Sequence, residues 1–316
     1  MKNVRSLLVI AVVAALAAGC SNSSQSSSSV SGGKAISKTI GVSIQNREAQ
    51  FYQDMESGMK SEAAKYGYAV DVVDANRDNA KQQAQVEDFI SQKVDAIVLT
   101  PYDSQAIGSA IAEANKAGIP VFTADIASTS KLGTVVSHVA SDNVQGGQQA
   151  GLLICAAVKS GAVAIVDEPE VTSVQDRVKG FRQALAQHCP GVTVVADVDA
   201  GGQRDTAAND VSDTLQSHPD LKGIFGINDD SALGAVTALK SAGMNGKVAV
   251  VGYDATPEAR TAIAAGDMYG DAIQSPQTIG ATTIDGIHAY FSGKKPPAVV
   301  HIPVGSFTKA DVAKTH

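Results

Sequence analysis

The chain has 316 residues, of which 44% are hydrophobic and 18% are charged, enough for two globular domains. Its 25 basic and 32 acidic side chains give a net charge of −7, which argues against a nucleic-acid-binding function, because phosphates require a basic surface. After residue 19, the apolar runs are strand-sized and predict no membrane-spanning helix.

The first 20 residues have the layout of an export signal. Lys2 and Arg5 precede an apolar run over 7–18 that is too short for a membrane span. Small residues then lead to Cys20 in the stretch LAAGC, which resembles a bacterial lipoprotein signal, in which the cysteine thiol is lipidated and becomes the new N-terminus. An ordinary secretory signal with an incidental cysteine is the alternative. In both cases the mature protein is exported, and in the lipoprotein interpretation residues 1–19 are removed.

A serine-rich segment follows the cysteine. Residues 21–33, SNSSQSSSSVSGG, contain eight serines and two glycines, and none of these side chains builds a core. This composition predicts a flexible linker, so we assign 20–35 to the lipidated cysteine and its linker. A lipid on Cys20 would hold the protein at a membrane while the linker lets it turn freely.

From residue 38 onward, strand-like and helix-like segments alternate. Strict alternation indicates parallel sheets covered by helices on both faces, an α/β fold. Short β-branched runs predict strands at 39–44, 69–73, 96–100, 121–123, 162–166, 193–196, 223–226 and 248–252. Amphipathic stretches predict helices at 51–66, 79–92, 104–117, 176–187, 206–217 and 231–242.

The order of these segments repeats. Ile107-Gly108 matches Leu233-Gly234 at an offset of 126, and Ala124-Asp125 matches Tyr253-Asp254 at an offset of 129. Matched residues at nearly constant offset predict two similar lobes. Because ligands of open α/β sheets bind beyond the carboxyl ends of the strands, two such lobes predict one cleft between them. The residues after the strands are polar: Gln45, Thr100, Tyr102, Asp103, Asp125, Asn228, Asp229, Asp230 and Asp254.

Besides Cys20, the chain has only Cys155 and Cys189. They do not form a CxxC motif, and no His or Cys cluster has the spacing of metal ligands, so we expect neither a metal nor a cofactor. In an oxidising compartment two remaining cysteines are expected to pair, and we predict a disulfide between them. The spacing leaves open whether both lie on the same face of the second lobe.

Residues 39–308 resemble the ribose-binding protein family, the type I periplasmic sugar-binding proteins of ABC importers. The motifs that carry the resemblance are VVSHVASDNVQGGQQAG (135–151), NDDSALGA (228–235), GYDATPE (252–258) and AIQSPQTIG (272–280). The lactose-repressor family shares this core but has an N-terminal DNA-binding head, where this chain has the lipoprotein signal.

The resemblance implies two Rossmann-like lobes joined by a three-strand hinge, with a sugar held between them. The implied first lobe spans 36–140 plus 275–304, and the implied second lobe spans 141–274 plus 305–316.

The sugar contacts of the family fall on residues that suit a sugar. Carboxylates and a guanidinium pair with neighbouring hydroxyls, amides donate and accept, and aromatic rings pack on the apolar sugar face. The retained positions are Phe51, Tyr52, Asp125, Arg177, Asn228, Asp254 and Gln274, and Gln45 is polar where the family has a small hydroxyl residue.

Three positions depart from the ribose-binding pattern. Ala49 replaces an asparagine, Ile126 replaces an arginine, and Gln203 stands where an aromatic ring usually stacks. The resemblance therefore implies a relative of ribose as ligand rather than ribose itself.

Each of these residues also has an ordinary structural interpretation. Asp254 precedes Thr256-Pro257, a helix start, and taken alone reads as a helix cap. The run 228–230 can cap the helix at Ser231, and we expect Asp229 or Asp230 to do so. Considered by itself, Arg177 is expected to be a solvated charge on a helix surface. Phe51 and Tyr52, considered singly, are expected to belong to the hydrophobic core. Their joint placement at matched strand ends favours the binding interpretation.

The predicted function is a solute-binding lipoprotein that passes a monosaccharide or related polyol to an ABC permease and its ATPase. We expect a monomer, anchored to a bacterial membrane through Cys20 and facing the periplasm or the cell exterior. A component that presents its ligand to a chemoreceptor or a sensor kinase is the alternative. An enzyme is disfavoured, because the sequence has no GxSxG, GxxxxGK[ST] or GxGxxG motif.

Overall fold

The computed structural model describes residues 38–312 and Lys314. The predicted export signal, Cys20 and the linker lie outside the described residues. Within the described part of the chain, none of the helices is both long and apolar enough to cross a membrane. Two six-stranded sheets form the framework of this part.

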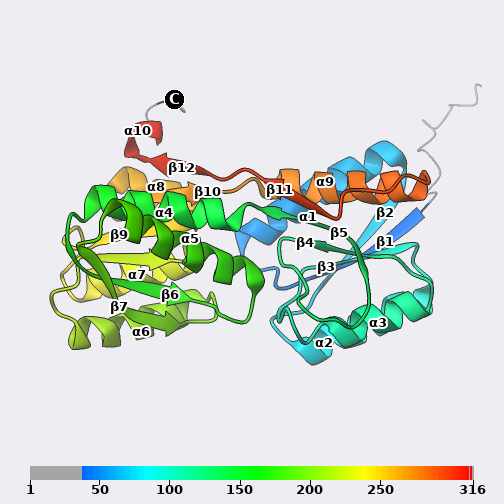
Figure 1. Cartoon of the computed structure of the whole chain (residues 1–316), viewed down its shortest axis with the longest axis horizontal. Coiled ribbons are helices and arrows are strands. Elements are labelled where there is room, and N and C mark those ends of the chain that lie inside the picture. The colour runs from blue at the N-terminus through cyan, green and yellow to red at the C-terminus, as the bar shows by residue number, and fades with distance from the viewer. Residues whose placement is uncertain (1–37, 313, 315–316) are drawn as a thin grey trace, which may run out of the picture. The chain divides into compact units, whose positions relative to one another are not determined.

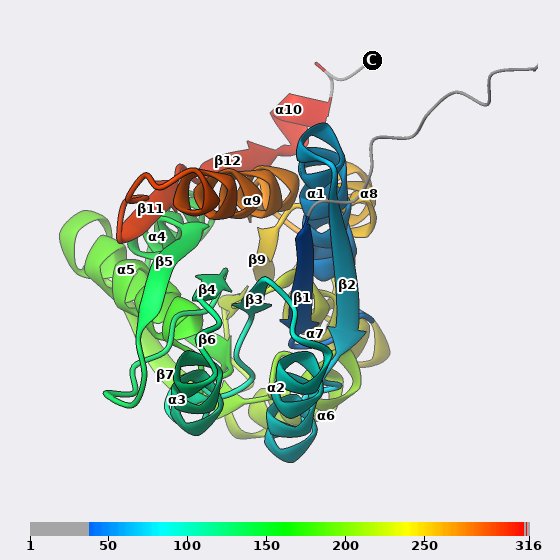
Figure 2. The same ribbon diagram turned by 90° about the vertical axis from the view of Figure 1, so that its right-hand side faces the viewer.

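The first sheet has the strand order β11-β5-β4-β3-β1-β2, and all its neighbouring strands are parallel. Figure 2 shows α2 and α3 on one side of this sheet and α1 and α9 on the other. The strands are β1 (Lys38–Ile44), β2 (Tyr68–Asp74), β3 (Ala96–Leu99), β4 (Val121–Ala124), β5 (Val135–Ser141) and β11 (Val299–Ile302). The helices are α1 (Gln50–Tyr66), α2 (Asn79–Gln92), α3 (Gly108–Lys116) and α9 (Pro276–Phe291). We call these elements the first lobe.

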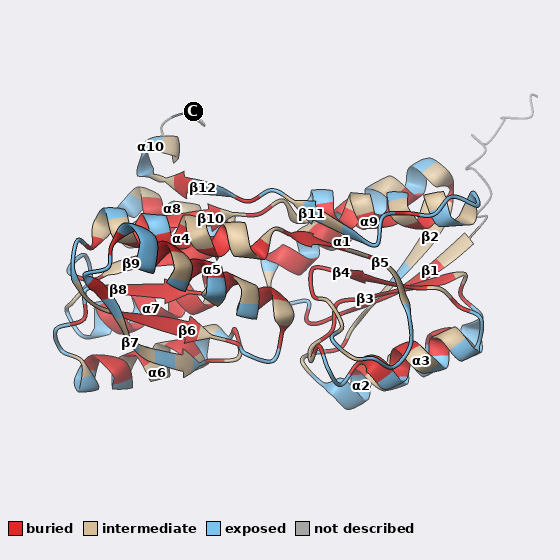
Figure 3. Cartoon of the chain, in the orientation of Figure 1, coloured by how far each residue is buried: buried red, intermediate tan, exposed pale blue. Residues whose placement is uncertain are grey.

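Both faces of this sheet are apolar, as expected for strands with helices on both sides. Ile40 and Val42 of β1 pack into the core beneath α1 and α9. Ile97 and Leu99 of β3 pack into the opposite core beneath α2 and α3. Successive side chains of a strand point to opposite faces, so each strand serves both cores. Figure 3 shows the central strands β3 and β4 buried, whereas the edge strand β2 is of intermediate burial.

The second sheet has the order β12-β10-β9-β8-β6-β7 and is parallel except for the antiparallel edge strand β12. Helices α4 and α5 cover one face, and α6, α7 and α8 cover the other. The strands are β6 (Gly161–Asp167), β7 (Val192–Asp199), β8 (Gly223–Gly226), β9 (Ala249–Asp254), β10 (Gly270–Ile273) and β12 (Gly305–Thr308). The helices are α4 (Asn143–Ala157), α5 (Thr172–His188), α6 (Arg204–Ser217), α7 (Asp229–Ser241), α8 (Pro257–Ala265) and α10 (Lys309–Val312). We call these elements the second lobe.

The chain crosses between the lobes three times. It passes from β5 to α4 at 141–143, from β10 to α9 at 273–276, and from β11 to β12 at 302–305. The crossing between β11 and β12 can be followed in Figure 1. This arrangement confirms the predicted α/β fold of two Rossmann-like lobes joined by a three-strand hinge.

The predicted strands and helices are all present, but some boundaries differ. Helix α3 begins at Gly108 rather than 104, because the Asp103 side chain accepts hydrogen bonds from the Gln105 and Ala106 amides and forms a turn first. Helix α5 begins at Thr172 rather than 176, where the Thr172 amide donates to Ser104 Oγ of the first lobe. The sequence analysis gave no ranges for β5, β10, β11, β12, α4, α8, α9 or α10, although it placed a helix start at Thr256-Pro257, where α8 begins.

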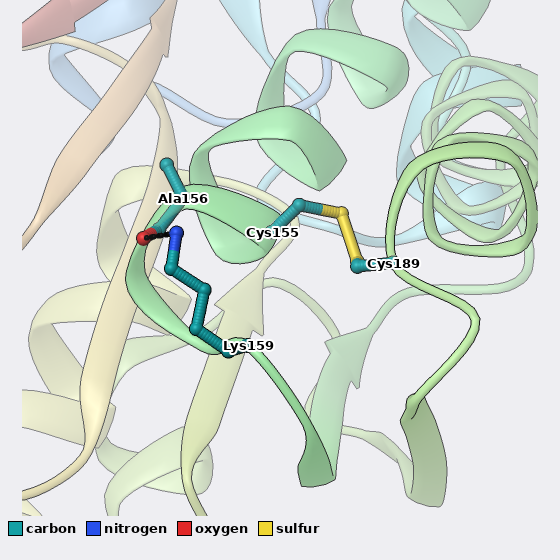
Figure 4. Close-up of a disulfide and its surroundings, with 4 residues drawn as sticks. All are labelled: Cys155, Ala156, Lys159 and Cys189. Atoms are coloured by element: carbon teal, nitrogen blue, oxygen red, sulfur yellow. Dashed lines mark hydrogen bonds between the residues drawn. A yellow bond between two sulfur atoms is a disulfide. The ribbon is translucent and has the colours of Figure 1, made fainter.

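A disulfide joins Cys155 of α4 to Cys189, the residue that ends α5, as the sequence analysis predicts. The two Cα atoms are 5.5 Å apart and the cysteines are separated by 34 positions. Figure 4 shows this bond beside the end of α4, where Lys159 Nζ donates to the carbonyl oxygen of Ala156. Closing a loop of this length stabilises a fold by about 3–4 kcal/mol in the chain-entropy model. The bond fixes the two helices that cover one face of the second sheet.

Candidate functional site

The carboxyl ends of strands from both sheets meet at a cavity of about 40 Å³, larger than the roughly 10–15 Å³ that one water needs. Both lobes line it. From the first lobe come Gln45, Asn46, Ala49, Phe51, Tyr52, Arg77, Asp125 and Ile126. From the second lobe come Glu168, Val171, Ser173, Val174, Arg177, Asn228, Asp254 and Gln274. A second hollow of about 290 Å³ shares Ala49, Phe51, Asn228 and Asp254 with it and lies beside it.

Gln45 follows β1 and organises the side of the first lobe. Its backbone amide donates to Thr100 Oγ1 at 2.6 Å, which fixes the chain at the end of the strand. The Tyr52 hydroxyl lies 2.9 Å from Gln45 Oε1 and 3.2 Å from Asp125 Oδ2, and it donates its one proton to either acceptor. Phe51 packs edge-to-face against Tyr52, with ring centroids 5.3 Å apart. These three side chains are buried and preformed.

Asp125 follows β4 in a left-handed conformation with φ 63°, which aspartate tolerates better than most residues. Its amide donates to the carbonyl oxygen of Val139 at 2.8 Å, which holds the turn. The carboxyl group is 3% exposed, and its Oδ1 has no hydrogen-bond partner among the described residues. The nearest cation is Arg177, whose Nη2 is 4.0 Å from Oδ1. This distance is too long for a hydrogen bond and leaves an acceptor directed at the cavity.

Arg177 is not the solvated charge that its position on a helix suggests. It is 5% exposed, and its Nε donates to Asn143 Oδ1 at 2.9 Å while Nη1 donates to the carbonyl oxygen of Ile227 at 2.8 Å. The guanidinium carbon lies 4.0 Å from the ring centroid of Tyr253, a cation–π contact. Elements α4, β8 and β9 of the second lobe thereby fix the guanidinium, and Nη2 faces Asp125 of the first lobe.

Asp254 and Gln274 occupy the ends of the neighbouring strands β9 and β10. Gln274 Nε2 donates to Asp254 Oδ1 at 2.6 Å, and Gln274 Oε1 accepts from the hydroxyl of Ser141 at the first crossing. Asp254 is not the cap of α8, because Thr256 has that role and accepts the amide of Ala259. Gln274 therefore links a cavity residue to two of the three crossings.

Asn228 lines the cavity and is also the cap of α7. Its Oδ1 accepts the Ser231 amide at 2.8 Å and its Nδ2 donates to the carbonyl oxygen of Gly202 at 3.1 Å. The expectation that Asp229 or Asp230 would cap this helix is wrong. Both are already within α7, and the side chain that precedes the helix has the extended backbone of a cap.

The structure does not bring Gln203 to the cavity. It is the exposed residue before α6 and lines neither hollow between the lobes. The other two departures from the ribose-binding pattern, Ala49 and Ile126, do line the cavity. The wall of the first lobe therefore has a methyl group and a butyl group where the family pattern has an amide and a guanidinium.

Residues 40–295 match the family model described as a periplasmic binding protein domain. The ribose import binding protein of Escherichia coli K12 is 36% identical over 271 residues, covering 84% of this chain and 89% of that protein. The chain belongs to the type I periplasmic sugar-binding proteins, the ribose-binding family. Members of this family are binding proteins and not enzymes.

Two solved structures of solute-binding proteins of ABC transporters are similar in fold as well. The protein from Actinobacillus succinogenes 130z with bound D-allose has a TM-score of 0.81 and 30% identity, covering 88% of this chain and 99% of that one. The protein from Bacillus halodurans C-125 with bound myo-inositol has a TM-score of 0.80 and 31% identity, covering 90% and 99%.

Glu168, which the sequence analysis missed, is the main addition to the site. It follows β6, is 5% exposed, and its Oε1 accepts Gln45 Nε2 at 3.0 Å, a hydrogen bond between the lobes. Its Oε2 lies so close to Gly202 that a Cβ there would be 2.6 Å from it. Glycine at 202, with φ 63°, thus leaves room for this carboxyl group.

Burial makes the cavity unfavourable for its three carboxylates. Burial raises the pKa of Asp125 to about 6, although the guanidinium of Arg177 opposes this. Burial also raises the pKa of Glu168 to about 7, against the field of Arg77. Burial and the neighbouring Asp229 raise the pKa of Asp254 well above its ordinary value. The site therefore favours bound groups that donate hydrogen bonds to carboxyl oxygens.

Glu168→Gln should stabilise the ligand-free protein near neutral pH. Because the pKa of Glu168 is raised in the folded protein, the stability that this group contributes is fully present below pH 4.5 and is lost as the pH rises through about 7. Glutamine keeps the acceptor for Gln45 without the charge. The free energy of unfolding of Glu168→Gln should therefore exceed that of the wild type by on the order of 3 kcal/mol at pH 8 and equal it near pH 4. Denaturant unfolding across this range measures the difference. Glu170→Gln, at an exposed neighbouring position, is the control and should change the free energy of unfolding little. If the free energies of Glu168→Gln and the wild type depend on pH in the same way, Glu168 does not have the raised pKa assigned to it.

Proposed function

We propose that the chain is an extracytoplasmic solute-binding lipoprotein of an ABC importer. It binds a monosaccharide or related polyol between its lobes and delivers it to the permease. The observation that carries this proposal is the shared cavity, which is lined by carboxyl groups from both lobes, two aromatic rings of the first lobe and the fixed guanidinium of the second. A polyhydroxylated ring suits this set, since each hydroxyl donates to a carboxyl oxygen and accepts from a guanidinium or amide.

The relatives support this ligand class. Their names and bound ligands are a pentose (ribose), a hexose (D-allose) and a cyclitol (myo-inositol), all polyhydroxylated and uncharged. The proposed contacts in this chain are Gln45, Phe51, Tyr52, Asp125, Arg177, Asn228, Asp254 and Gln274, with Glu168 added from the geometry. Because Ile126 and Ala49 remove polar groups from the wall of the first lobe, we propose a ligand other than ribose.

A thermal-shift screen over pentoses, hexoses, polyols and inositols identifies the ligand, because a compound that binds only the folded state raises its melting temperature. We expect one molecule per chain with a dissociation constant of about 10⁻⁸ to 10⁻⁵ M. With the best compound of that screen, Arg177→Ala should weaken binding at least about thirtyfold, because it leaves buried partners unpaired. Isothermal calorimetry measures this loss.

Arg177→Lys keeps the positive charge but loses the planar guanidinium with its several donors. It should also bind the ligand weakly, which would show that the geometry of the donors matters beyond the charge. Lys179→Ala removes an exposed cation from the same helix and should bind normally. Tight binding of an amino acid or nucleotide, with no response to any polyhydroxylated compound, would refute the proposal.

Binding should close the lobes. Neither lobe alone satisfies the hydroxyl groups of a ligand, so the ligand has higher affinity for the arrangement in which Gln45 meets Glu168 and Arg177 faces Asp125. We expect small-angle scattering to show a smaller radius of gyration at saturation than without ligand. An unchanged radius, together with unchanged hydrogen exchange at the three crossings, would count against closure.

The lipid anchor belongs to the same proposal and rests on the LAAGC stretch and the serine-rich linker. Expressed in a bacterium, the full chain should partition with the membrane fraction, because the lipid on Cys20 anchors it. Cys20→Ser should carry no lipid, because serine has no thiol to be acylated, and less of it should be in the membrane fraction. Membrane fractionation followed by mass spectrometry of the N-terminal peptide tests this. An unmodified Cys20 in the mature protein would contradict the anchor.

A further inference from the structure

Two buried carboxyl groups lie near Asp254, and no ion pair among the described residues includes either of them; Arg260 of α8 donates to the carbonyl oxygen of Ala255 instead. Asp271 of β10 is fully buried, and neither of its oxygens has a hydrogen-bond partner that meets strict geometry among the described residues. Asp229, the first residue of α7, is 3% exposed, and its Oδ1 likewise lacks a partner. Such groups destabilise a fold unless they are neutral or bonded.

The register of the second sheet places these groups together. In the ladder between β9 and β10, Asp271 lies directly beside Gly252. Paired residues of neighbouring parallel strands point to the same face, and the strands are about 4.8 Å apart. A Cβ on Gly252 would lie 2.9 Å from Asp229 Oδ1, so the Asp229 carboxyl group fills the space that this glycine leaves. The Asp229 and Asp271 carboxyl groups therefore meet over Gly252.

The charged groups around this pair do not neutralise it. Asp254 on β9 and Asp230 on α7 add negative charge, while Arg177 on α5 acts on Asp254 from the other side. Burial and the charge of the adjoining Asp229 raise the pKa of Asp271 well above its ordinary value. Two buried carboxyl groups in contact behave as one unit that retains a proton.

The pair holds a strained turn. Asp229 Oδ2 accepts the Thr256 amide at 2.7 Å, and the Ala255 amide faces Asp271. Asp254 and Ala255 have φ angles of 126° and 58°, which are unfavourable for a residue with a Cβ. Such a conformation persists only where its surroundings fix it.

We propose that Asp271 is a positioning residue: it shares one proton with Asp229, and this shared proton holds the turn that presents Asp254 to the cavity. The Asp271 hydroxyl donates to Asp229 Oδ1, which gives both orphaned groups a partner. The effect on ligand affinity rests on the function proposed above, whereas the shared proton does not.

The sign of the pH effect follows from the raised pKa. The stability that the pair contributes is fully present below the ordinary pKa of an aspartate and is lost as the pH rises through the pKa of the folded pair. Loss of the proton leaves two carboxylates in contact, and the turn loosens. Both melting temperature and ligand affinity should therefore fall in the alkaline range.

Asp271→Asn tests this, since its amide donates to Asp229 as the protonated acid does but does not titrate. The infrared difference spectrum between ligand-free wild type and Asp271→Asn at neutral pH should contain a protonated-carboxyl band, whereas the bands of Glu168 and Asp254, which both proteins share, cancel in the difference. Melting curves from pH 5 to pH 9.5 should show a smaller alkaline decline for the variant than for the wild type. The exposed Asp220→Asn should keep both the band and the decline.

For affinity we use D-ribose, D-allose and myo-inositol as probes in calorimetry. Binding of any of them should weaken about tenfold for each pH unit above the pKa of the pair in the wild type, and less in Asp271→Asn. Should Asp271→Asn fail to fold, Asp271→Thr supplies a hydroxyl donor and should give the same infrared and melting results. If none of the probes binds, the proposed function is in doubt while the infrared and melting results still decide the shared proton. The proposal is overturned if Asp271→Asn keeps the infrared band of the wild type, or if its melting temperature falls with rising pH as steeply as that of the wild type.

Discussion

The buried guanidinium of Arg177 is the constraint on which the site depends. Removing a cation from water is unfavourable unless acceptors compensate it, and Arg177 donates to Asn143 and to the carbonyl oxygen of Ile227, with the ring of Tyr253 beneath it. These contacts all come from the second lobe. The remaining nitrogen faces Asp125 across the cavity at 4.0 Å. The fixed guanidinium therefore determines where a ligand hydroxyl has to lie to join the two lobes.

The carboxyl groups of the cavity reduce the stability of the ligand-free fold but suit a ligand that donates hydrogen bonds. Three carboxyl groups approach one small space, and burial disfavours the ionised form of each. Hydroxyl groups of a ligand supply donors without adding charge, and donors that stabilise the ionised carboxylates oppose the effect of burial. A binding site of this kind is a place where the ligand-free fold is less stable than it would be with neutral side chains.

The sequence predicted the fold because its strands are short, apolar and regularly spaced between amphipathic helices. The strands β10, β11 and β12 were not predicted, because they lie next to the crossings, where the regular alternation of strand and helix breaks down. For the site, strand ends pointed to Gln45, Asp125 and Asp254, and all three line the cavity. Glu168 follows β6 in the same way, but the acidic run 167–170 reads as a solvated loop in the sequence.

Other parts of the site depend on contacts that no local pattern contains. The orientation of Arg177 is set by Asn143 and Tyr253, which are 34 and 76 positions away. The meeting of Asp229 and Asp271 depends on strand register and on the missing side chain of Gly252. Gln203 shows the reverse case, in which a position transferred from a family pattern lies on the surface of α6.

Both cysteines of the described residues belong to the second lobe, and their bond joins two helices on one face of its sheet. A covalent link between α4 and α5 raises the free energy of any local opening that separates them, whereas the described helices of the first lobe have no such link. Fluctuations that expose backbone amides should therefore concentrate in the first lobe. That lobe carries the network of Gln45, Tyr52 and Asp125. The lobe with the larger local fluctuations is therefore also the lobe whose order a bound ligand would increase.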